Sequence, residues 1–330
     1  MKFKQFENLI CVSHDDVDHK IDYFNMDLLA LDRLLKYGLI LLDKPSGQTS
    51  NEVVFMVKQI LKIQKAGHSG TLDPLVSGLL PIGLNDATKA LSILHLGPKE
   101  YHAIGRLHAH FKIDDINNIL SKFRGDIYQK PPQRSSVLRK TRIRKIFELE
   151  LIEQKNNLVL IRVLCASGTY IRKLLYDVGE LLGSGATMIE LRRNRINQFN
   201  ENNSRFVTLH ELFDAYELWI QKNDCSKLKK IILPIELALS EIKTVIVRDS
   251  AVDALCHGAQ LAIPGILFIS PNIQKGDLIA IYTLKCEIIA LAEATLSKDE
   301  ISKNVKGYAF KTKRIIMVPN TYKKSWRTNS

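Results

Sequence analysis

The sequence predicts an α+β protein in which a central sheet flanked by helices is followed by a smaller, strand-rich domain. Three observations support this class. Strand-like and helix-like segments are intermixed from residue 38 to about residue 239. From residue 242 to residue 319, short apolar segments are separated by Gly and Pro turns. With 330 residues, the chain is long enough for one large and one small domain.

Composition restricts the kind of partner. Hydrophobic residues make up 45% and charged residues 25% of the chain, as in ordinary globular proteins. The formal net charge of +12 favours a polyanionic partner such as RNA, although ribosomal proteins and membrane-surface binders are similarly basic. No apolar run reaches the roughly 18 residues that span a bilayer, and the N-terminus lacks the apolar centre of a signal peptide. We expect a soluble intracellular protein without a membrane partner.

Cysteine and histidine spacing favours neither a disulfide framework nor a metal site. The five cysteines are scattered, and no C-x-x-C pair occurs. His102, His108 and His110 have even spacing on a predicted strand, so their side chains could share one face as metal ligands do. Three side chains in line along one strand do not readily surround an ion, and no fourth ligand is evident. We expect buried thiols in a reducing compartment and no bound metal.

The chain begins with a polar, irregular segment that leads into the central sheet. A short helix is predicted over Asp27–Lys36. The apolar run Leu39–Leu42 ends in a Lys-Pro-Ser-Gly turn, which predicts a buried strand. Thr49 and Ser50 can cap a helix that continues through Ile60, because apolar residues follow at helical spacing.

Helices and strands continue through the large domain. Helices are predicted over Asp86–Leu94 and Ile113–Phe123, each with an Asp near its start, which suits the helix dipole. Strands are predicted over Ile143–Ile152 and Leu158–Cys165, which alternate or are rich in β-branched residues. A helix over Thr169–Leu182 is closed by a glycine. This mixed order predicts an α+β domain built on a central sheet.

One loop stands out chemically. Residues 67–83 read GHSGTLDPLVSGLLPIG and place a single carboxylate, Asp73, in a sharply bent turn. Gly70 can adopt backbone angles closed to other residues, and Pro74 fixes the φ angle after the acid. A stiff loop of this kind suits a group that must meet a reacting atom at a set distance. The alternative is that Asp73 only forms a turn or caps a helix.

The loop closely resembles the signature of the TruB/dyskerin family of RNA pseudouridine synthases, and four further motifs occur in the same order. The upstream motif is similar to the family's LDKP-G element. Downstream motifs are similar to the strand that carries the family's tyrosine, to its GTYIR element and to its LRR element. In this sequence the LDKP-G element corresponds to Tyr37–Gly47, and the tyrosine strand begins with Lys99–Tyr101. The GTYIR element corresponds to Ser167–Arg172, and the LRR element to Leu191–Arg193. Together they span about 150 residues and identify the chain as a member. The resemblance implies a mixed, largely antiparallel sheet of the pseudouridine synthase type.

The resemblance implies a catalytic set of Asp73, Tyr101 and Arg172. Asp73 would be the essential carboxylate, acting either as a nucleophile at the uracil ring or the ribose anomeric carbon, or as a base toward the ribose. Arg172 would be the cation beside it, which lowers the pKa of a carboxylate and orients its oxygens. Tyr101 would lie against the target base with its hydroxyl available for proton transfer, a buried core tyrosine being the alternative. No metal or organic cofactor is expected for this reaction.

Further residues are expected to bind or support the substrate. Lys44 would support the floor of the site, and His68 would either fill the space left by the flipped nucleotide or brace the loop. Leu191 would pack under the base. Arg192 and Arg193 would face phosphate or a buried carboxylate.

The C-terminal part resembles a PUA domain, a small β-barrel that binds RNA. Three segments carry the likeness, at 253–259, 261–265 and 275–277. Gly258 with Ala259 would let RNA approach the main chain, or would simply form a tight turn. Five short strands are predicted, over Ile242–Val247, Leu267–Ile269, Leu278–Tyr282, Ile288–Ala292 and Arg314–Val318. The expected domains are an N-terminal extension at 1–37 that packs on the C-terminal domain, and the catalytic domain at 38–239. The PUA domain at 240–322 and a tail at 323–330 follow.

Three features favour the archaeal dyskerin type over bacterial tRNA-specific TruB enzymes. This chain has only a compact connection before Thr141, where those enzymes carry a long insertion. Tyr128–Arg134 is similar to the dyskerin-type QRPP element, and Tyr322–Trp326 resembles the segment that ends the folded part of dyskerin. Basic residues crowd the connection and suggest an RNA-facing strand or loop, or else a solvated surface: Arg134, Arg139, Lys140, Arg142, Arg144 and Lys145.

The resemblance implies isomerisation of uridine to pseudouridine. The expected partners are tRNA, H/ACA guide RNA with rRNA, and the small proteins of the H/ACA ribonucleoprotein. The rival hypothesis is a non-catalytic RNA-binding scaffold with the same fold, and the intact Asp73, Tyr101 and Arg172 set argues against it. We expect a cytoplasmic location for an archaeal protein, and a nucleolar one for a eukaryotic protein.

Overall fold

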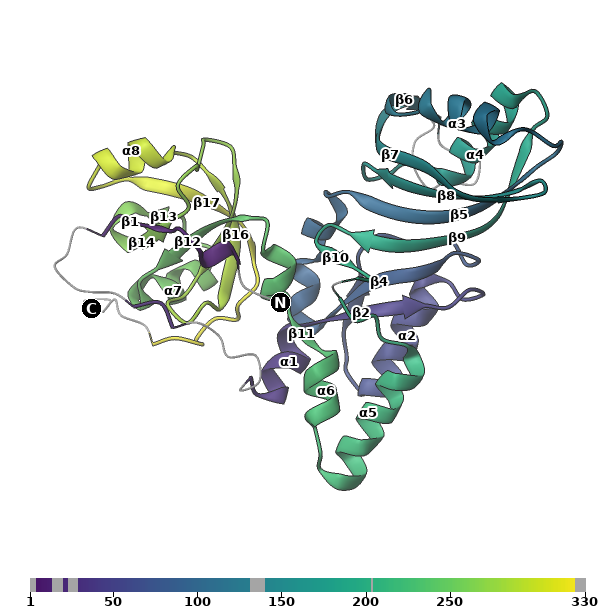
Figure 1. Ribbon diagram of the computed structural model, residues 1–330. Coiled ribbons are helices and arrows are strands. Elements are labelled where there is room, and N and C mark those ends of the chain that lie inside the picture. Colours follow the sequence, from purple (N-terminus) through teal and green to yellow (C-terminus); the bar gives the residue numbers. More distant parts are fainter. Residues whose placement is uncertain (1–3, 14–19, 23–28, 131–139, 203, 324–330) are drawn as a thin grey trace.

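Two β-sheets organise the computed structural model (Figure 1), which describes residues 4–13, 20–22, 29–130, 140–202 and 204–323. Within these residues, the larger sheet has ten strands, with the main order β11-β2-β4-β9-β5-β8-β7-β6, β3 on β4 and β10 on β9. Its strands are β2 Gly38–Lys44, β3 Ala66–His68, β4 Ser77–Leu84, β5 Lys99–Leu107, β6 Gly125–Gln129, β7 Arg142–Lys155, β8 Leu158–Cys165, β9 Ala186–Ile196, β10 Phe199–Asn200 and β11 Leu233–Pro234.

The large sheet is mixed and largely antiparallel, which confirms the predicted fold class. Its one parallel pairing among the described strands joins β4 to β9, with Ser77 opposite Arg192 and Gly78 opposite Arg193. This pairing places the LRR motif beside the strand that follows the Asp73 loop. Gly78 has φ +100°, and a Cβ there would lie 2.3 Å from the Arg193 carbonyl oxygen, so the close approach of the two strands requires glycine.

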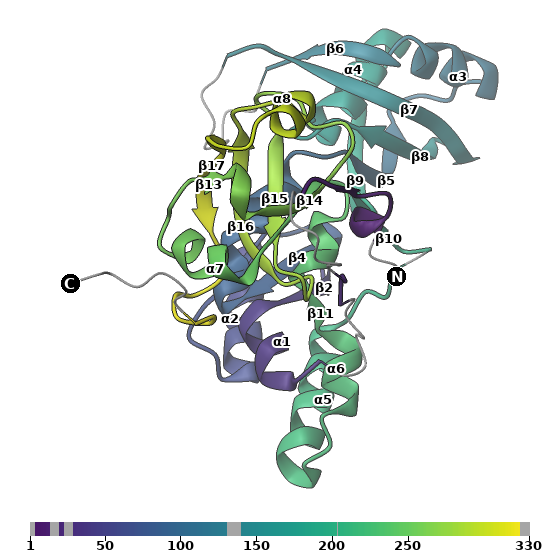
Figure 2. The same ribbon diagram turned by 90° about the vertical axis from the view of Figure 1, so that its left-hand side faces the viewer.

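Helices cover the large sheet in two groups (Figure 1). α3 and α4 cover the β5–β8 part, where Leu174 and Leu175 pack with Val159 and Ile161. α2 and α5 pack on β2 and β4, and α5 with α6 forms a hairpin that projects beyond the sheet (Figures 1 and 2). These helices are α1 Leu31–Tyr37, α2 Ser50–Leu61, α3 Ile113–Ser121, α4 Ile171–Leu182, α5 Leu209–Lys222 and α6 Ser226–Ile231.

The predicted caps of two helices are confirmed. Thr49 caps α2 in a capping box with Glu52, because each side chain accepts from the other residue's backbone N–H. α4 ends at Gly183, which has φ +80°. α4 begins at Ile171 rather than at the predicted Thr169, because Tyr170 is extended.

The single helix predicted over Asp86–Leu94 is wrong. The chain instead forms two 3₁₀ helices, η3 Asn85–Lys89 and η4 Leu91–His95. Ala87, Ala90 and Ile93 are buried, and this spacing of three residues is the period of a 3₁₀ helix, not of an α-helix. The apolar residues of Asp86–Leu94 fit both the 3₁₀ and the α-helical period, so the sequence alone did not distinguish the two kinds of helix.

The smaller sheet has seven strands among the described residues, in the order β1-β14-β12-β15-β16-β17-β13. The strands are β1 Ile10–Cys11, β12 Lys243–Val247, β13 Leu261–Ala262, β14 Ile266–Ile269, β15 Leu278–Tyr282, β16 Ile288–Ala294 and β17 Tyr308–Ile315. The remaining helices are η1 Lys4–Phe6, η5 Ile235–Leu239, α7 Asp249–Cys256, η6 Ile263–Gly265 and α8 Lys298–Lys303.

The last predicted strand, Arg314–Val318, is largely wrong in its bounds. β17 ends at Ile315, and it begins at Tyr308 in a segment whose alternating charged side chains hide its strand character. The apolar residues after it, Ile316 and Met317, are buried at the end of the strand, where both backbone N–H groups donate to the Ile289 carbonyl oxygen.

The N-terminal segment joins the smaller sheet. β1 pairs with β14, and the Phe6 ring meets the Tyr282 ring edge-on at 4.9 Å between centroids. Leu39 and Leu41 share one buried cluster with residues of the smaller sheet, so a common apolar core joins the two sheets. None of the described helices has the length and apolar content needed to cross a membrane. The predicted helix Asp27–Lys36 lies partly outside the described residues. Residues 131–139, with Arg134 and Arg139 of the basic connection and the end of the QRPP-like element, lie outside them, as do residues 324–330, which include the end of the Tyr322–Trp326 segment.

Candidate active site

The loop that carries Asp73 is pinned at both ends. Before Asp73, the Ser69 backbone N–H donates to the Pro81 carbonyl at 2.9 Å, and the buried Ser69 hydroxyl donates to the Leu91 carbonyl at 3.0 Å. The Leu72 N–H donates to the Ser50 hydroxyl at 2.9 Å, and that hydroxyl donates back to the Leu72 carbonyl at 3.1 Å. The carboxylate therefore projects from a fixed backbone.

The Lys-Pro-Ser-Gly turn after β2 braces the other side of this loop. The Lys44 side chain is fully buried, and its ammonium donates to the carbonyl oxygens of Pro45, Gln48 and Pro74 at 2.7, 2.7 and 3.0 Å. The Gly47 N–H also donates to the Pro74 carbonyl, at 2.9 Å. Burial lowers the pKa of Lys44, and the nearby Asp73 charge opposes this shift. Lys44 thus lies beneath the loop, where a floor residue was predicted.

Replacing Lys44 with Met is expected to lower the free energy of unfolding by roughly 3 kcal/mol, because three carbonyl oxygens lose a charged donor. Urea unfolding should show a lower midpoint at an unchanged slope. Lys227→Met, at an exposed position on α6, is the control and should change stability by less than about 0.5 kcal/mol. Equal stabilities of the two variants would contradict a bracing role.

Arg172 and Asp73, 99 residues apart in the chain, meet at the surface. The Arg172 Nη2 atom lies 3.1 Å from Asp73 Oδ2, and the two side chains are 61% and 60% exposed. Arg172 lies in the first turn of α4. The buried Gln129 side chain holds the residue before that helix, since it accepts from the Tyr170 N–H at 2.9 Å and donates to the Tyr170 carbonyl at 3.1 Å. The predicted ion pair is therefore present.

Tyr101 lies on β5, opposite Arg193 of β9. Its side chain is partly buried. Burial raises the pKa of Tyr101, and the charge of the Arg193 guanidinium opposes that rise. The negative charge of Asp73 adds to the rise. Tyr101 is a protonated phenol at neutral pH.

Arg193 and Arg192 point to opposite faces of β9 and have different partners. Arg193 is 2% exposed and donates to the carbonyl oxygens of Leu79 and Gly70, at 2.9 and 2.7 Å. Neither acceptor is the phosphate or carboxylate expected from the sequence. Arg192 instead has the carboxylates: it donates to both oxygens of Asp43, at 2.8 and 3.0 Å, and to Glu201.

His68 and Leu191 lie close to this group. His68 ends β3 and is partly buried, and its Nδ1 atom has no hydrogen-bond partner among the described residues. Burial, together with Arg193 and His95, lowers the pKa of His68, so its ring is neutral at neutral pH. Leu191 is 8% exposed and packs in the cluster that contains Leu72.

Gly258 and Ala259 lie in the part of the chain that forms the smaller sheet, and not in the larger sheet that carries Asp73, Tyr101 and Arg172. Gly258 follows α7 with φ +93°. The Ala259 carbonyl accepts from the Thr312 hydroxyl at 2.7 Å. The backbone here forms a turn.

Sequence reasoning missed three supports of the site. Ser50 was identified only as a possible helix cap, although its hydroxyl holds Leu72. Gln129 was noted only as part of a motif, and Arg144 only as a basic residue, although Arg144 donates to the Gly168 carbonyl at 3.0 Å just before the Arg172 helix. A polar side chain that holds a backbone group of a distant segment gives no signal in sequence spacing.

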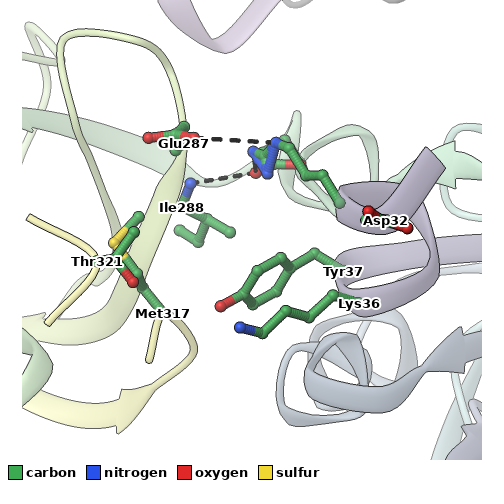
Figure 3. Close-up of a pocket in the computed structure, with 9 residues that line it drawn as sticks. Asp32, Lys36, Tyr37, Glu287, Ile288, Met317 and Thr321 are labelled. Atoms are coloured by element: carbon green, nitrogen blue, oxygen red, sulfur yellow. Dashed lines mark hydrogen bonds and ion pairs between the residues drawn. The ribbon is translucent and has the colours of Figure 1, made fainter. Parts of the chain in front are cut away.

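The Asp73–Arg172 ion pair lies on the open surface and not in an enclosed cavity. A cavity of about 260 Å³ lies elsewhere, between α1 and the smaller sheet, and contains none of the Asp73, Tyr101 and Arg172 side chains (Figure 3). Tyr37, Lys36 and Glu287 are among the residues that line it. Among the described residues, no group of three or more His, Cys, Asp or Glu side chains is arranged to hold a metal ion. An exposed carboxylate on a rigid loop is accessible to a large substrate.

Three family models match the chain in succession. Residues 58–171 match the TruB family pseudouridylate synthase N-terminal domain. Residues 172–240 match the tRNA pseudouridylate synthase B C-terminal domain, and residues 243–316 match the PUA domain.

Individual proteins are similar over almost the whole chain. The probable tRNA pseudouridine synthase B of Archaeoglobus fulgidus is 43% identical over 300 residues, which cover 91% of this chain and 92% of that protein. A chain from the "Structure of H/ACA RNP bound to a substrate RNA containing 2'-deoxyuridine" is 37% identical with a TM-score of 0.87, covering 99% of this chain and 100% of that one. A chain from the "Crystal Structure of a Cbf5-Nop10-Gar1 Complex" is 40% identical with a TM-score of 0.86, covering 94% of each.

Proposed function

Because the chain belongs to the TruB family of pseudouridylate synthases, we propose that it isomerises uridine to pseudouridine in RNA at the Asp73 loop. The chain is an isomerase, and the proposal concerns its site and its substrates. The observation that carries it is the 3.1 Å ion pair between Asp73 and Arg172, exposed on a loop that Ser50, Lys44 and Arg193 hold in place.

The reaction breaks the bond between N1 of uracil and C1′ of ribose, turns the base, and joins C1′ to C5. C5 loses a proton and N1 gains one, so the atoms of the nucleoside are unchanged. Ionised Asp73 acts either as a nucleophile or as a base toward the ribose. Arg172 holds one of its oxygens in place, and Tyr101 would lie against the target base. The target uridine has to leave its stack to reach Asp73.

The proposed substrates are the T-loop uridine of tRNA and uridines of rRNA selected by H/ACA guide RNA. The names of the similar proteins support both, since one is a probable tRNA pseudouridine synthase B and another is part of an H/ACA ribonucleoprotein with substrate RNA. The small proteins of that particle are the proposed protein partners. The net charge of +12 supports an RNA substrate.

We divide these tasks among the expected domains. Residues 38–239 would carry the catalytic site, and 240–322 would be the RNA-binding PUA domain, with Gly258 and Ala259 at a close approach to RNA. Residues 1–37 would pack on that domain, a role supported by the pairing of β1 with β14. A cytoplasmic location fits a protein whose similar chains include one from the archaeon Archaeoglobus fulgidus.

The direct test is to incubate the purified chain with unmodified tRNA, with and without guide RNA and the small partner proteins, and to map pseudouridine. We expect product in tRNA, at guide-selected positions, or in both. RNA binding without product in any arm would favour the non-catalytic scaffold.

RNA affinity is expected to fall about a hundredfold or more when the salt concentration rises roughly fourfold, because cationic side chains release counterions from the phosphates they contact. Filter binding or fluorescence anisotropy over a salt series measures the slope. A dissociation constant that does not change with salt would contradict phosphate contacts by the basic surface.

A further inference from the structure

The ion pair between Asp73 and Arg172 does not fix its own geometry. The two side chains are 60% and 61% exposed. An exposed ion pair contributes little free energy, because water screens the attraction and long side chains lose entropy when they are held. The 3.1 Å contact therefore depends on the backbone segments that carry the two residues. The Asp73 loop has the ties described above, and the start of α4 needs equivalent ones.

The start of α4 lacks the usual local stabilisation. Its N-cap residue is Tyr170, and no side-chain cap is formed there. The first turn contains no acidic residue and carries Arg172, although the helix dipole favours anions at this end. The helices α2, α5 and α8 each begin with a capping box instead. The local sequence therefore does not fix the first turn of α4.

Gln129, the last residue of β6, supplies the missing cap from a distant part of the chain. Its side-chain oxygen accepts from the Tyr170 N–H at 2.9 Å, which is the bond that a glutamate makes in a capping box. Its amide nitrogen donates to the Tyr170 carbonyl at 3.1 Å, and this carbonyl also accepts the first helical bond of α4, from the Leu174 N–H. Gln129 is 1% exposed, so water does not compete for these bonds.

A second contact holds the turn that leads into α4. The Arg144 Nε atom donates to the Gly168 carbonyl at 3.0 Å. Gly168 has φ +77°, and a Cβ there would lie 3.1 Å from Arg144 Nη2. Arg144 belongs to β7, the strand that pairs with β6, so both contacts come from the same pair of strands. Arg144 holds the turn, whereas Gln129 reaches the N-cap residue itself.

We propose that Gln129 is a positioning residue for the reaction, because it fixes the start of α4 and thereby holds the Arg172 guanidinium against Asp73. Its side chain is buried and acts through the backbone, not on the substrate. Without the amide, the first turn of α4 frays and Arg172 spends less time within reach of the carboxylate. A rate that depends on the orientation of Asp73 falls accordingly. This inference rests on the proposed function.

A double-mutant cycle tests the inference. The variants are Gln129→Met, Arg172→Gln and the pair, measured as single-turnover rates at saturating RNA. Gln129→Met keeps the length of the side chain and removes both hydrogen bonds. It should lower the rate about 30-fold in the wild-type background, but by no more than about twofold where Arg172 is already Gln. RNA affinity should stay near that of the wild type. Equal losses in both backgrounds would overturn the proposal.

Two further variants show whether the hydrogen bonds of Gln129 matter. Burial favours the neutral form of a carboxyl group, which can accept from an N–H and donate to a carbonyl as the amide does. Gln129→Glu should therefore recover the rate to within about tenfold of wild type, and more fully as the pH is lowered. Gln129→Asn withdraws the amide by one methylene and replaces Gln129→Met in the cycle if that variant does not fold. A Gln129→Glu rate no higher than that of the variant used in the cycle would count against the proposal.

Gln154→Met is the matched control. Gln154 lies on β7, is partly buried and donates to the Phe111 carbonyl at 2.9 Å, so the same chemical change removes a similar bond away from α4. The rate should stay within about twofold of wild type. A loss as large as that of Gln129→Met would show a general effect on the domain and would overturn the positioning role.

Amide hydrogen exchange tests the proposed motion without a catalytic assay. In Gln129→Met, exchange at the Tyr170 N–H and in the first turn of α4 should accelerate by about tenfold or more, while the last turn of α4 keeps its wild-type protection. Equal acceleration throughout the large sheet would overturn the proposal, because Gln129 would then only stabilise the fold. Absence of pseudouridine from the wild-type chain in every arm would instead refute the proposed function.

Discussion

Replacing Asp73 with Asn is expected to lower pseudouridine formation by more than about a millionfold, which corresponds to an increase of roughly 8 kcal/mol in the barrier. Asn keeps the shape of the side chain and removes the charge, so it cannot act as a nucleophile or as a base toward the ribose. The loop should keep its conformation, since its ties run through backbone groups and through Ser50 and Lys44. RNA binding should therefore stay near that of the wild type.

Single-turnover assays on one RNA, with binding measured in parallel, separate these effects. Asp177→Asn is a suitable control, because Asp177 is also paired with a cation, Lys173, on the nearby helix α4. It should leave the rate within about twofold of wild type. Residual turnover of Asp73→Asn within about tenfold of wild type would remove Asp73 from the mechanism.

Replacing Arg172 with Gln is expected to lower the rate by about a thousandfold, roughly 4 kcal/mol of barrier, while the free energy of unfolding changes by less than about 1 kcal/mol. The small effect on stability follows from the exposure of the pair, since both side chains are more than half exposed and solvent screens their attraction. The large effect on rate follows from the loss of the group that holds an Asp73 oxygen 3.1 Å away and of its charge.

Arg172→Lys keeps the charge without the planar donor fork, so its rate should lie between those of Arg172→Gln and the wild type. Arg205→Gln is the matched control, because Arg205 is also exposed and pairs with Glu211 at 2.7 Å. Its rate should equal that of the wild type. If Arg172→Gln unfolds at much lower urea but retains its rate when folded, the ion pair is structural.

The sequence predicted the elements whose pattern is local. The strands Leu158–Cys165 and Leu278–Tyr282 have the predicted bounds, because β-branched and apolar residues predominate there and favour the extended conformation. The α2 cap and the glycine end of α4 follow from the residue types at those positions. Asp86–Leu94 failed because 3₁₀ and α periods differ by less than one residue, so a short apolar segment fits both.

The site was predictable as a set of residues and not as a geometry. The motif around Asp73 supplied the acid, and the order of the motifs supplied Tyr101 and Arg172. The exposure of the ion pair and the burial of Arg193 beneath it had no signal in the sequence. Lys44 was expected near the floor, but its three carbonyl acceptors became visible only in the folded chain.

The sequence by itself determined the family, the acid in its bent loop and most of the strands and helices, because backbone limits and side-chain period act within a few residues. Only the tertiary structure decided which side chains meet. Arg172 reaches Asp73 across 99 residues of chain because α4 begins where Gln129 holds Tyr170. Arg193 lies opposite Tyr101 because of the register between β5 and β9, which depends on how the whole sheet packs its buried face.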